Sequence, residues 1–476
     1  MALRPLPNPA SAPATRAAVL AAADKARLRR YAEYLEFYDG KQWAKPRHGR
    51  SNLVLNYARA IVDKGVSYLL GRGINFAVPP AGPSSEEQAR ASAAEELLYR
   101  VYEGNDLEAV DIQGALNGAI LGDTVFKVFW GQRSGGWSQG TEGIRVVNID
   151  PFTFFPRWAS DDPSTLLSVS LVYRLSAEEA ERRWADAEPR GHGGTERGAF
   201  PRASASPCRH VGEEVEVVEE WTPSQFVLAV GDREVLRAPN PYGFIPFVHI
   251  PNVRPANEFW GTSDLKDLMP LNRELNERMS DVADVIRFHC DPPVIFKGVT
   301  EHSNLAVGPG TVWDVPEGAE VELLEWRGQA PAVHEHIERV MRAIHDVTET
   351  PKTAFGDSGR LLSGVALETE LQPLIQKTLR KRTWWNAGLR QRNRQILRIA
   401  ELKGLGSFAP YRSRVIWPPL LPADDEVEVR NNVALVAAGL RSRRTAMDRL
   451  GEENPEEELR RIGEEAGSTD GGTRGR

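Results

Sequence analysis

The sequence predicts an α+β protein that is predominantly helical and is divided into several structural units. Its 476 residues are more than one hydrophobic core usually organises, so we expect two to four units. Periodicity typical of amphipathic helices dominates both ends of the chain. Short runs typical of strands, separated by Gly, Pro and Asp, occupy the middle.

The composition argues against several classes of protein. The net charge is −7 and the pI is about 5.9, so no global basic field holds nucleic acid, and any contact with DNA is local or weak. No apolar run reaches the ~18 residues needed to cross a bilayer, and Asp24 interrupts the short run Ala17–Ala23, so we expect no membrane partner and no signal peptide. Cys208 and Cys290 are too few for a disulfide framework, which fits a reducing compartment.

The first ninety residues predict two helices and a linker. Residues 1–14 are rich in Pro and Ala, and we expect a disordered arm. Thr15–Tyr38 predicts one helix that ends at Asp39-Gly40. Asn52–Leu70 predicts a second helix with one apolar face. Residues 79–92 are rich in Pro, Ser and Glu and predict a linker.

The strand-like runs lie between Ala119 and Ile250 and predict a sheet-rich unit. Their sequences are VFKVFW, IRVVNI, LLSVSLVYRL, EEVEVVEEW, QFVLAV and EVLRA. The polar, Gly-rich stretch Gly191–Arg209 interrupts them and predicts a mobile excursion.

Two amphipathic helices flanking a small β unit follow. Pro270 should start or kink a helix, so we expect an unbroken rod over Leu271–His289. Its apolar stripe comprises Leu265, Leu268, Asn272, Leu275, Met279, Val282 and Ile286, and its charged face Arg273, Glu277, Asp281 and Asp284. The apolar face of the second helix comprises Val333, Ile337, Val340, Ile344 and Val347. The runs VIFKG, TVWDV and VELLEW between the two helices predict a small head on a helical stalk.

A long helix and three short ones are predicted for the C-terminal part. Ser363–Lys403 favours a continuous helix with a kink at Pro373. Asp424, Ser442 and Pro455 mark the starts of three short helices.

The loop Thr350–Gly364 contains Gly-Asp-Ser-Gly, the sequence that surrounds the nucleophile of one class of serine proteases. Such a protease needs an upstream His and Asp carried on two β-barrels. Here only His289-Cys290 is available, at the end of a predicted helix. We favour a flexible loop of small residues, with a hydrolase that uses Ser358 as the alternative.

A histidine-rich helix segment resembles a metal site only superficially. The candidate ligands are His334, His336, Glu338 and His345. A zincin helix needs His at positions i and i+4, but the residue four after His334 is Glu338. We favour a solvated helix face and expect no metal and no cofactor, with a metal-dependent hydrolase as the alternative.

Six segments occur in an order and at spacings that match a known family. They are FYDGKQW, NLVLNYARAIVDKGVSYLLG, VNIDPFTFFP, NPYGFIPFVHIPN, GTSDLKDLMPLNRELNERMSDVADV and PPLLPADDEVEVRNNVALVAAGLRSRRTAMDRLG. Together, over about Tyr31–Glu465, the chain resembles the portal proteins of tailed bacteriophages, in the SPP1-type siphovirus portal family.

The resemblance implies a portal fold with wing, stem, clip and crown that assembles into a ring, usually of twelve subunits, at one vertex of the capsid. Double-stranded DNA would be packaged and ejected through the ring without sequence specificity, and the protein would not be an enzyme. Implied partners are the large terminase, head-completion or adaptor proteins, and the major capsid and scaffolding proteins. Implied locations are the virion and, during assembly, the host cytoplasm.

The resemblance also implies domain boundaries. They are 1–14 for a disordered arm, 15–260 for the wing with its β-rich part at about 115–255, 261–290 for the first stem helix, 291–328 for the clip, 329–346 for the second stem helix, 347–362 for the tunnel loop, 363–404 for the long kinked wing helix, 405–465 for the crown and 466–476 for a disordered tail.

Two sets of site residues follow from these boundaries. The tunnel-loop residues expected near DNA are Lys352, Thr353, Ser358 and Arg360. The charges of Glu349, Lys352, Asp357 and Arg360 cancel, so the loop could touch phosphates without the strong binding that counterion release produces. The clip residues expected to dock terminase or adaptors are Lys297, Glu301, Trp313, Asp314 and Glu317.

The role of the basic stretch in the long helix and the class of phage ring both remain open at this point. Between Ile375 and Arg398 the long helix carries eight Lys or Arg residues and no acid. This basic stretch, Lys377–Arg398, either pairs with acids across subunit interfaces or faces packaged DNA. The chain could also be a head-tail adaptor ring, although adaptors are usually much shorter.

Overall fold

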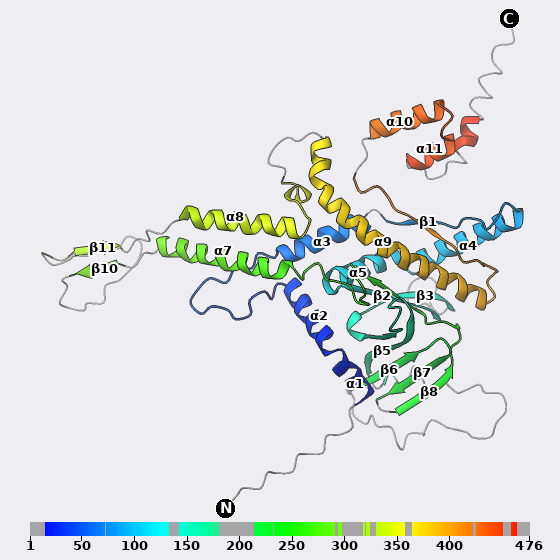
Figure 1. The fold of residues 1–476 in the computed structure, drawn as a ribbon, viewed down its shortest axis with the longest axis horizontal. Helices are drawn as coiled ribbons and strands as arrows, with labels where there is room; N and C mark the ends of the chain where they lie inside the picture. Colours follow the sequence, from blue (N-terminus) through cyan, green and yellow to red (C-terminus); the bar gives the residue numbers. More distant parts are fainter. Residues whose placement is uncertain are drawn as a thin grey trace, which may run out of the picture. The chain divides into compact units, whose positions relative to one another are not determined.

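The computed structural model describes residues 15–71, 73–132, 142–176, 178–179, 214–231, 233–290, 294–297, 318, 320–323, 330–357, 364–421, 425–450 and 458–463. Of the described residues, 52% are helical and 20% lie in strands, which confirms a mixed, predominantly helical protein. The chain divides into two compact units, Met1–Ile416 and Trp417–Arg476 (Figure 1).

The N-terminal helices are shorter than predicted. Helices α1 (Arg16–Ala23) and α2 (Lys25–Tyr38) are separated at Asp24, whereas the sequence predicted a single helix. Helix α3 (Tyr57–Leu70) begins five residues after Asn52, the predicted start, because Asn56 caps it by accepting a hydrogen bond of 3.1 Å from the Arg59 amide. The residues before α3 instead lie along the helix at Leu268–Cys290, whose side chains accept hydrogen bonds from the amides of Ser51, Leu53 and Leu55.

The predicted linker at 79–92 is wrong in its second half, where helix α4 (Ser85–Gly104) begins. The Ser84 hydroxyl accepts from the Glu87 amide at 3.3 Å and lies 2.9 Å from the Glu87 carboxylate. This Ser-x-x-Glu spacing is a recognised start signal for helices that the Pro/Ser/Glu composition concealed. Helix α5 (Leu107–Leu121) follows after a short turn.

The sheet-rich middle of the chain is confirmed and forms two antiparallel sheets. The first has the order β3 (Glu142–Ile149), β2 (Asp123–Gln132) and β9 (Phe247–Pro251), and the second has the order β4 (Phe154–Trp158), β5 (Leu166–Ser176), β6 (Glu214–Trp221), β7 (Gln225–Val230) and β8 (Arg233–Pro239). A separate pair joins β1 (Asn75–Ala77) to β12 (Arg414–Ile416). The predicted excursion Gly191–Arg209 lies outside the described residues.

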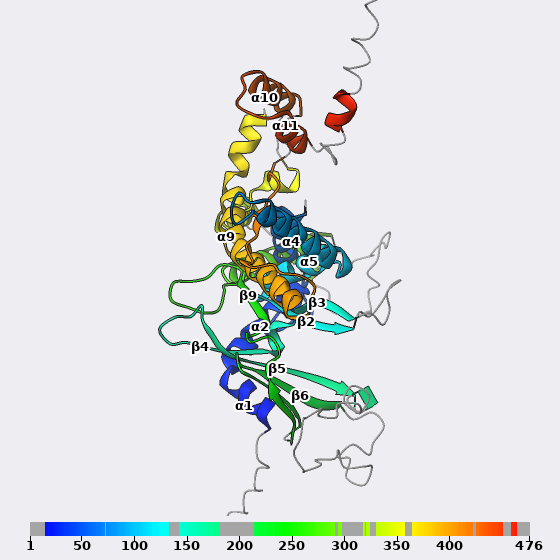
Figure 2. The same cartoon turned by 90° about the vertical axis from the view of Figure 1, so that its right-hand side faces the viewer.

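Aromatic side chains join the two sheets. Phe247 of the first sheet lies 6.0 Å from Phe154 and 6.4 Å from Trp221 of the second, measured between ring centroids. Figure 2 shows the first sheet between the second sheet and the helices α5 and α9. On the helical side, Phe126 packs edge-to-face against Trp385 at 6.1 Å, and both side chains are fully buried.

The predicted pair of amphipathic helices is present as α7 (Leu268–Cys290) and α8 (Ala330–Val347), which lie side by side (Figure 1). Pro270 falls in the first turn of α7, as predicted. Strands β10 (Val294–Lys297) and β11 (Glu320–Leu323) pair between the two helices in chain order, and the run TVWDV lies outside the described residues.

The apolar stripe predicted for α7 holds only over its first half. Leu265, Leu268 and Leu275 are buried, but Ile286 is 57% exposed. Asn276 and Ser280 are buried in place of the expected apolar residues.

The long C-terminal helix is confirmed almost to the residue as α9 (Gly364–Leu402), with Pro373 inside it. A short 3-10 helix, η2 (Lys352–Phe355), precedes it. The second unit contains α10 (Asp425–Ala437), α11 (Arg443–Arg449) and a helical segment at 458–463, close to the three predicted starts.

Candidate functional site

The turn between α8 and α9 is the described part of the loop in which the sequence placed its main candidate residues. Of those candidates, Lys352 and Thr353 lie in η2, whereas Ser358 and Arg360 lie outside the described residues. Glu349 has a positive φ of 52° and Gly356 one of 88°, so residues with left-handed backbone conformation flank η2 on both sides.

The last turn of α8 holds the base of this loop. The imidazole Nδ1 of His345 donates to the Thr350 carbonyl at 2.7 Å, and the Thr350 amide donates back to the His345 carbonyl at 3.1 Å. The Thr348 hydroxyl donates to the Ile344 carbonyl at 2.7 Å. Thr350 is fully buried, so these bonds fix the backbone where it leaves the helix.

Helix α9 holds the same base from the other side. The buried Lys377 donates from Nζ to the Thr348 carbonyl at 3.0 Å. One turn further along, Arg380 forms an ion pair with Glu349 at the surface. The loop therefore starts from a backbone segment that both helices clamp.

A buried charge cluster beneath the turn connects the same helix to the start of α7. Asp264, four residues before α7, pairs with Lys381, lies 3.9 Å from Lys377, and accepts from the Asn252 amide at 3.0 Å. Burial of the Asp264 carboxyl raises its pKa, but the two lysines and these hydrogen bonds outweigh burial and lower the pKa to about 2. The cluster is thus ionised and ties α7 to α9.

The tip of the turn combines an exposed charge with small residues. The Lys352 side chain is exposed, and the Thr353 hydroxyl is buried without a hydrogen-bond partner among the described residues. Phe355 is 38% exposed, and Lys64 lies 5.6 Å from the centre of its ring. A shallow cleft beside the turn is lined by Glu338, Arg342, His345, Asp346, Glu349, Pro351, Lys352 and Pro373, in which acids and bases nearly balance.

A second feature, a polar ladder on α7, was not predicted. Its members, which we call the α7 ladder, are Asn272, Asn276, Ser280 and Asp284, spaced four residues apart. Their side chains accept in turn from the amides of Ala58 at 3.0 Å, Leu55 at 2.9 Å, Leu53 at 2.9 Å and Ser51 at 2.7 Å. The ladder thus provides partners for backbone amides of the extended segment 51–55, in the way a neighbouring strand would, and for one amide in the first turn of α3.

The loop that precedes the extended segment is held by the same face of α7. Arg47 pairs with Asp281 at 2.6 Å, and Gln42 accepts from Asn272 at 2.9 Å and from Asn276 at 2.6 Å. The face that the sequence predicted to be charged is therefore partly covered by the basic loop after α2. A period-four row of Asn, Asn, Ser and Asp was the signal that could have indicated this.

The basic stretch of α9 has intrachain partners at its buried positions, which neither alternative anticipated. Lys377 and Lys381 pair with Asp264, as described above. Arg392 is fully buried and makes a bidentate contact with Asp111, and it donates to the Tyr102 hydroxyl at 3.0 Å. The acids belong to the same chain because α9 crosses the helical layer instead of lying on the surface.

The remaining predicted residues are scattered or lie outside the described parts. Lys297 on β10 forms an exposed ion pair of 2.6 Å with Glu322 on β11. The other four candidates of this β unit, Glu301, Trp313, Asp314 and Glu317, lie outside the described residues.

The histidines of α8 do not converge on a common position where a metal ion could bind. His334 lies 3.4 Å from Glu338 on one side of α8, whereas His336 lies 3.0 Å from Glu274 on α7. In the described part of the chain, no three His, Cys, Asp or Glu side chains lie close enough to share an ion. Nor does any described helix combine the length and apolarity needed to span a membrane.

Comparison with known proteins identifies a family. Residues 18–184 and 208–472 match the sequence profile of the family described as phage portal protein, SPP1 Gp6-like. The unmatched residues between these ranges overlap Gly191–Arg209, the stretch that interrupts the strand-like runs. No curated protein matches the chain significantly.

The family consists of structural proteins of the phage capsid that form oligomeric rings, and the hydrolase and adaptor alternatives have no support. Since the match covers nearly the whole sequence, this chain belongs to the SPP1 Gp6-like family of phage portal proteins.

Proposed function

We propose that this chain forms a closed ring, of about twelve copies, through which double-stranded DNA is packaged and later ejected. The observation that carries this proposal is the turn between α8 and α9, whose base is clamped by Lys377 and His345 while its tip bears the exposed Lys352. A firmly based loop with few charges can contact a moving polyanion repeatedly without holding it.

The proposed domains follow the boundaries that the resemblance to the family implies. In this proposal, residues 15–260 with 363–404 form the wing, 261–290 and 329–346 the stem, 291–328 the clip, 347–362 the tunnel loop and 405–465 the crown. The side-by-side packing of α7 and α8 supports their assignment as a stem. The buried pairing of Asp264 with Lys381 supports a mechanical connection between stem and wing helix.

The tunnel loop would contact the phosphate backbone. Lys352, Thr353, Ser358 and Arg360 are the proposed contact residues. Lys352 is exposed and has no ion pair with any residue in the described ranges, so its ammonium is available for a phosphate. Contacts of this type read no base sequence, which suits a conduit for a whole genome.

The experiment that tests this role uses Lys352→Ala and Arg360→Ala in assembled capsids. We expect a changed packaging rate or a changed length of retained DNA, because each substitution removes a phosphate-binding cation from every copy of the loop. Lys25→Ala is the matched control, since Lys25 is an exposed lysine on α2. If the loop variants package like this control, the assignment of Lys352 and Arg360 is wrong.

The clip would dock the large terminase during packaging and head-completion or adaptor proteins afterwards. Lys297, Glu301, Trp313, Asp314 and Glu317 are the proposed docking residues. Trp313→Ala should weaken copurification of the terminase with the ring because large aromatic residues dominate binding energy at interfaces. Trp158→Ala serves as the control in the wing, and equal copurification by the two variants would remove Trp313 from the docking surface.

In this proposal the ring works inside the virion, at the capsid vertex, after assembly in the host cytoplasm with the major capsid and scaffolding proteins. It needs no cofactor, since the motor that consumes energy would be the terminase.

A further inference from the structure

Five arginines gather where the last turns of α9 meet the segment that follows it. We call them the Arg412 cluster, and its members are Arg90, Arg394, Arg398, Arg412 and Arg414. All but Arg398 are exposed. Among the described residues, none of the four exposed arginines forms an ion pair. In a chain with a net charge of −7, such a local excess of unpaired cations is unexpected.

The backbone that carries the cluster is firmly placed. The segment after α9 lies along that helix, where the Phe408 amide donates to the Glu401 carboxylate at 2.9 Å and Asn393 donates to the Ser413 hydroxyl at 3.3 Å. Strand β12 then pairs with β1, with Arg414 opposite Ala77. Arg412 lies two residues before Arg414, the first residue of β12, and both are exposed whereas Ser413 between them is buried.

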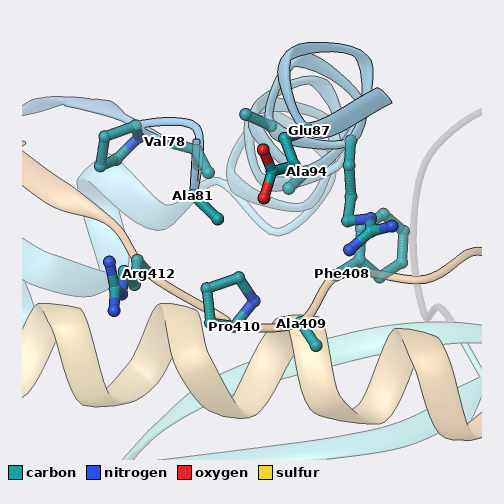
Figure 3. Close-up of a pocket in the computed structure, with 11 residues that line it drawn as sticks. Val78, Ala81, Glu87, Ala94, Phe408, Ala409, Pro410 and Arg412 are labelled. Atoms are coloured by element: carbon teal, nitrogen blue, oxygen red, sulfur yellow. The ribbon is translucent and has the colours of Figure 1, made fainter. Parts of the chain in front are cut away.

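A small pocket brings Arg90 of α4 to the same place. Its walls are formed by residues from α4, from the segment after β1 and from the segment after α9. Figure 3 shows Arg412 at the left of this pocket, above α9, with Pro410 and Ala409 along the lower edge of the pocket and Glu87 at its upper edge. Arg90 also lines the pocket, so it and Arg412 approach one opening from two different elements.

Two nearby acids, Glu87 and Glu401, are already engaged with other groups. Glu87 lies 2.9 Å from the Ser84 hydroxyl and completes the cap of α4. Glu401 accepts from the Phe408 amide and also faces the Tyr411 hydroxyl. Tyr411, with a positive φ of 57°, lies near Arg394 and Arg398 as well. These acids hold the scaffold together and leave the exposed guanidinium groups without counterions.

We propose that the Arg412 cluster binds the phosphate backbone of double-stranded DNA, without reading its sequence, at a site separate from the tunnel loop. Arginine presents a fork of donors that matches phosphate oxygens. Arg394 and Arg398 are one turn apart, about 6 Å along the helix, and Arg412 lies two residues before Arg414 at the start of β12. A single carboxylate engages one or two arginines, whereas an array of this extent requires an extended polyanion. An acidic protein surface is the competing occupant, because arginine is also enriched at protein interfaces, and competition with polyglutamate separates the two.

The test measures binding of a closed circular DNA duplex to the assembled protein. Such a circle cannot thread through a preformed ring, so it reports on surfaces outside the channel. The variant Arg90→Ala, Arg394→Ala, Arg412→Ala is compared with Arg29→Ala, Arg30→Ala, Arg100→Ala, which removes the same charge from exposed positions on α2 and α4. Affinity is measured over a range of salt concentrations, and circular dichroism verifies the folding of each variant.

We expect the cluster variant to bind the circle more weakly than the control at every salt concentration. Its plot of log affinity against log salt should be shallower by about 0.9 for each phosphate that the cluster no longer neutralises. The variant Lys352→Ala, Arg360→Ala should bind the circle as the unmodified protein does, so failure of the cluster proposal and failure of the tunnel-loop proposal give different results.

Three outcomes would overturn the proposal. The cluster variant could retain the affinity and salt slope of the unmodified protein. The control could lose as much affinity as the cluster variant, which would point to net charge alone. Finally, polyglutamate of equal charge could displace the circle as effectively as DNA does, which would indicate an acidic protein as the partner.

Discussion

The Nζ atom of Lys377 lies 3.0 Å from the carbonyl oxygen of Thr348, so α9 holds the residue that immediately follows α8. Both residues are buried, and Lys377 also lies 3.9 Å from Asp264 ahead of α7. One side chain therefore connects the ends of two paired helices with the long helix that crosses the molecule. The base of the loop is therefore fixed, and any motion of the loop is confined to the residues beyond this base.

Replacing Lys377 with Met should lower the free energy of unfolding by about 1–3 kcal/mol, because the buried Thr348 carbonyl loses one of its two donors and keeps only the Thr350 hydroxyl. Chemical denaturation of the purified protein measures this change. Gln376→Ala, at the exposed neighbouring position, is the control. Equal stability of the two variants would show that Lys377 does not hold the turn.

The carboxyl of Asp264 should make stability depend on pH in the acid range. Its pKa is about 2 in the folded protein and close to the ordinary value of 3.8 when unfolded. Between these values the unfolded chain binds more protons, so stability falls as the pH drops and is fully present above about pH 4. The contribution is on the order of 2 kcal/mol, at about 1.4 kcal/mol for each pKa unit.

This pH effect is measured as the difference between the unmodified protein and Asp264→Asn in denaturation experiments at several pH values. The difference should shrink between about pH 4 and pH 2, the range set by the pKa shift of Asp264. Asp267→Asn, at an exposed neighbouring acid, should give no such trend. A difference that stays constant with pH would contradict the account of an ionised, buried Asp264.

Asn276→Ala should loosen the extended segment that the α7 ladder holds. The Leu55 amide would lose its acceptor, at a cost of about 1 kcal/mol. Hydrogen exchange at Leu53 and Leu55 should become faster, while exchange in α9 stays unchanged. Glu277→Ala, at the adjacent exposed position, is the control, and similar exchange rates in both variants would remove the ladder as the support of this segment.

Arg392→Met should destabilise the protein by about 3–5 kcal/mol, because Asp111 would remain as a buried charge without its partner. Exchanging both residues, Arg392→Met with Asp111→Leu, should recover much of this loss, since it removes the unpaired charge. Thermal unfolding measures both effects. Arg390→Met is the exposed control, and a double variant no more stable than Arg392→Met would contradict the argument from desolvation.

The sequence predicted the long C-terminal helix and the two sheets, because these elements follow from patterns of neighbouring residues. Gly364–Leu402 was predicted within about one residue at each end because helix-favouring residues continue without interruption and Pro373 is tolerated as a kink. The two sheets followed from short β-type runs. Helix α4 was missed because composition was given more weight than the capping signal at Ser84 and Glu87.

Features that depend on distant contacts could not be predicted in this way. Lys381 and its partner Asp264 are 117 residues apart, and Arg392 and Asp111 are 281 apart, so no local pattern indicates which cations are buried. Residues 52–56 have helical periodicity, but α7 offers their backbone amides side-chain acceptors and keeps them extended. For the tunnel loop, the sequence located the turn and Lys352, but not the buried clamp beneath it.

The central claim is that copies of this chain form a ring whose channel is lined by the turn between α8 and α9. Electron cryomicroscopy of the purified, full-length protein tests it most directly. The account predicts a closed ring of about twelve copies, with residues 351–357 facing the axial hole. A monomer or dimer, or a ring in which residues 351–357 face away from the hole, would contradict it.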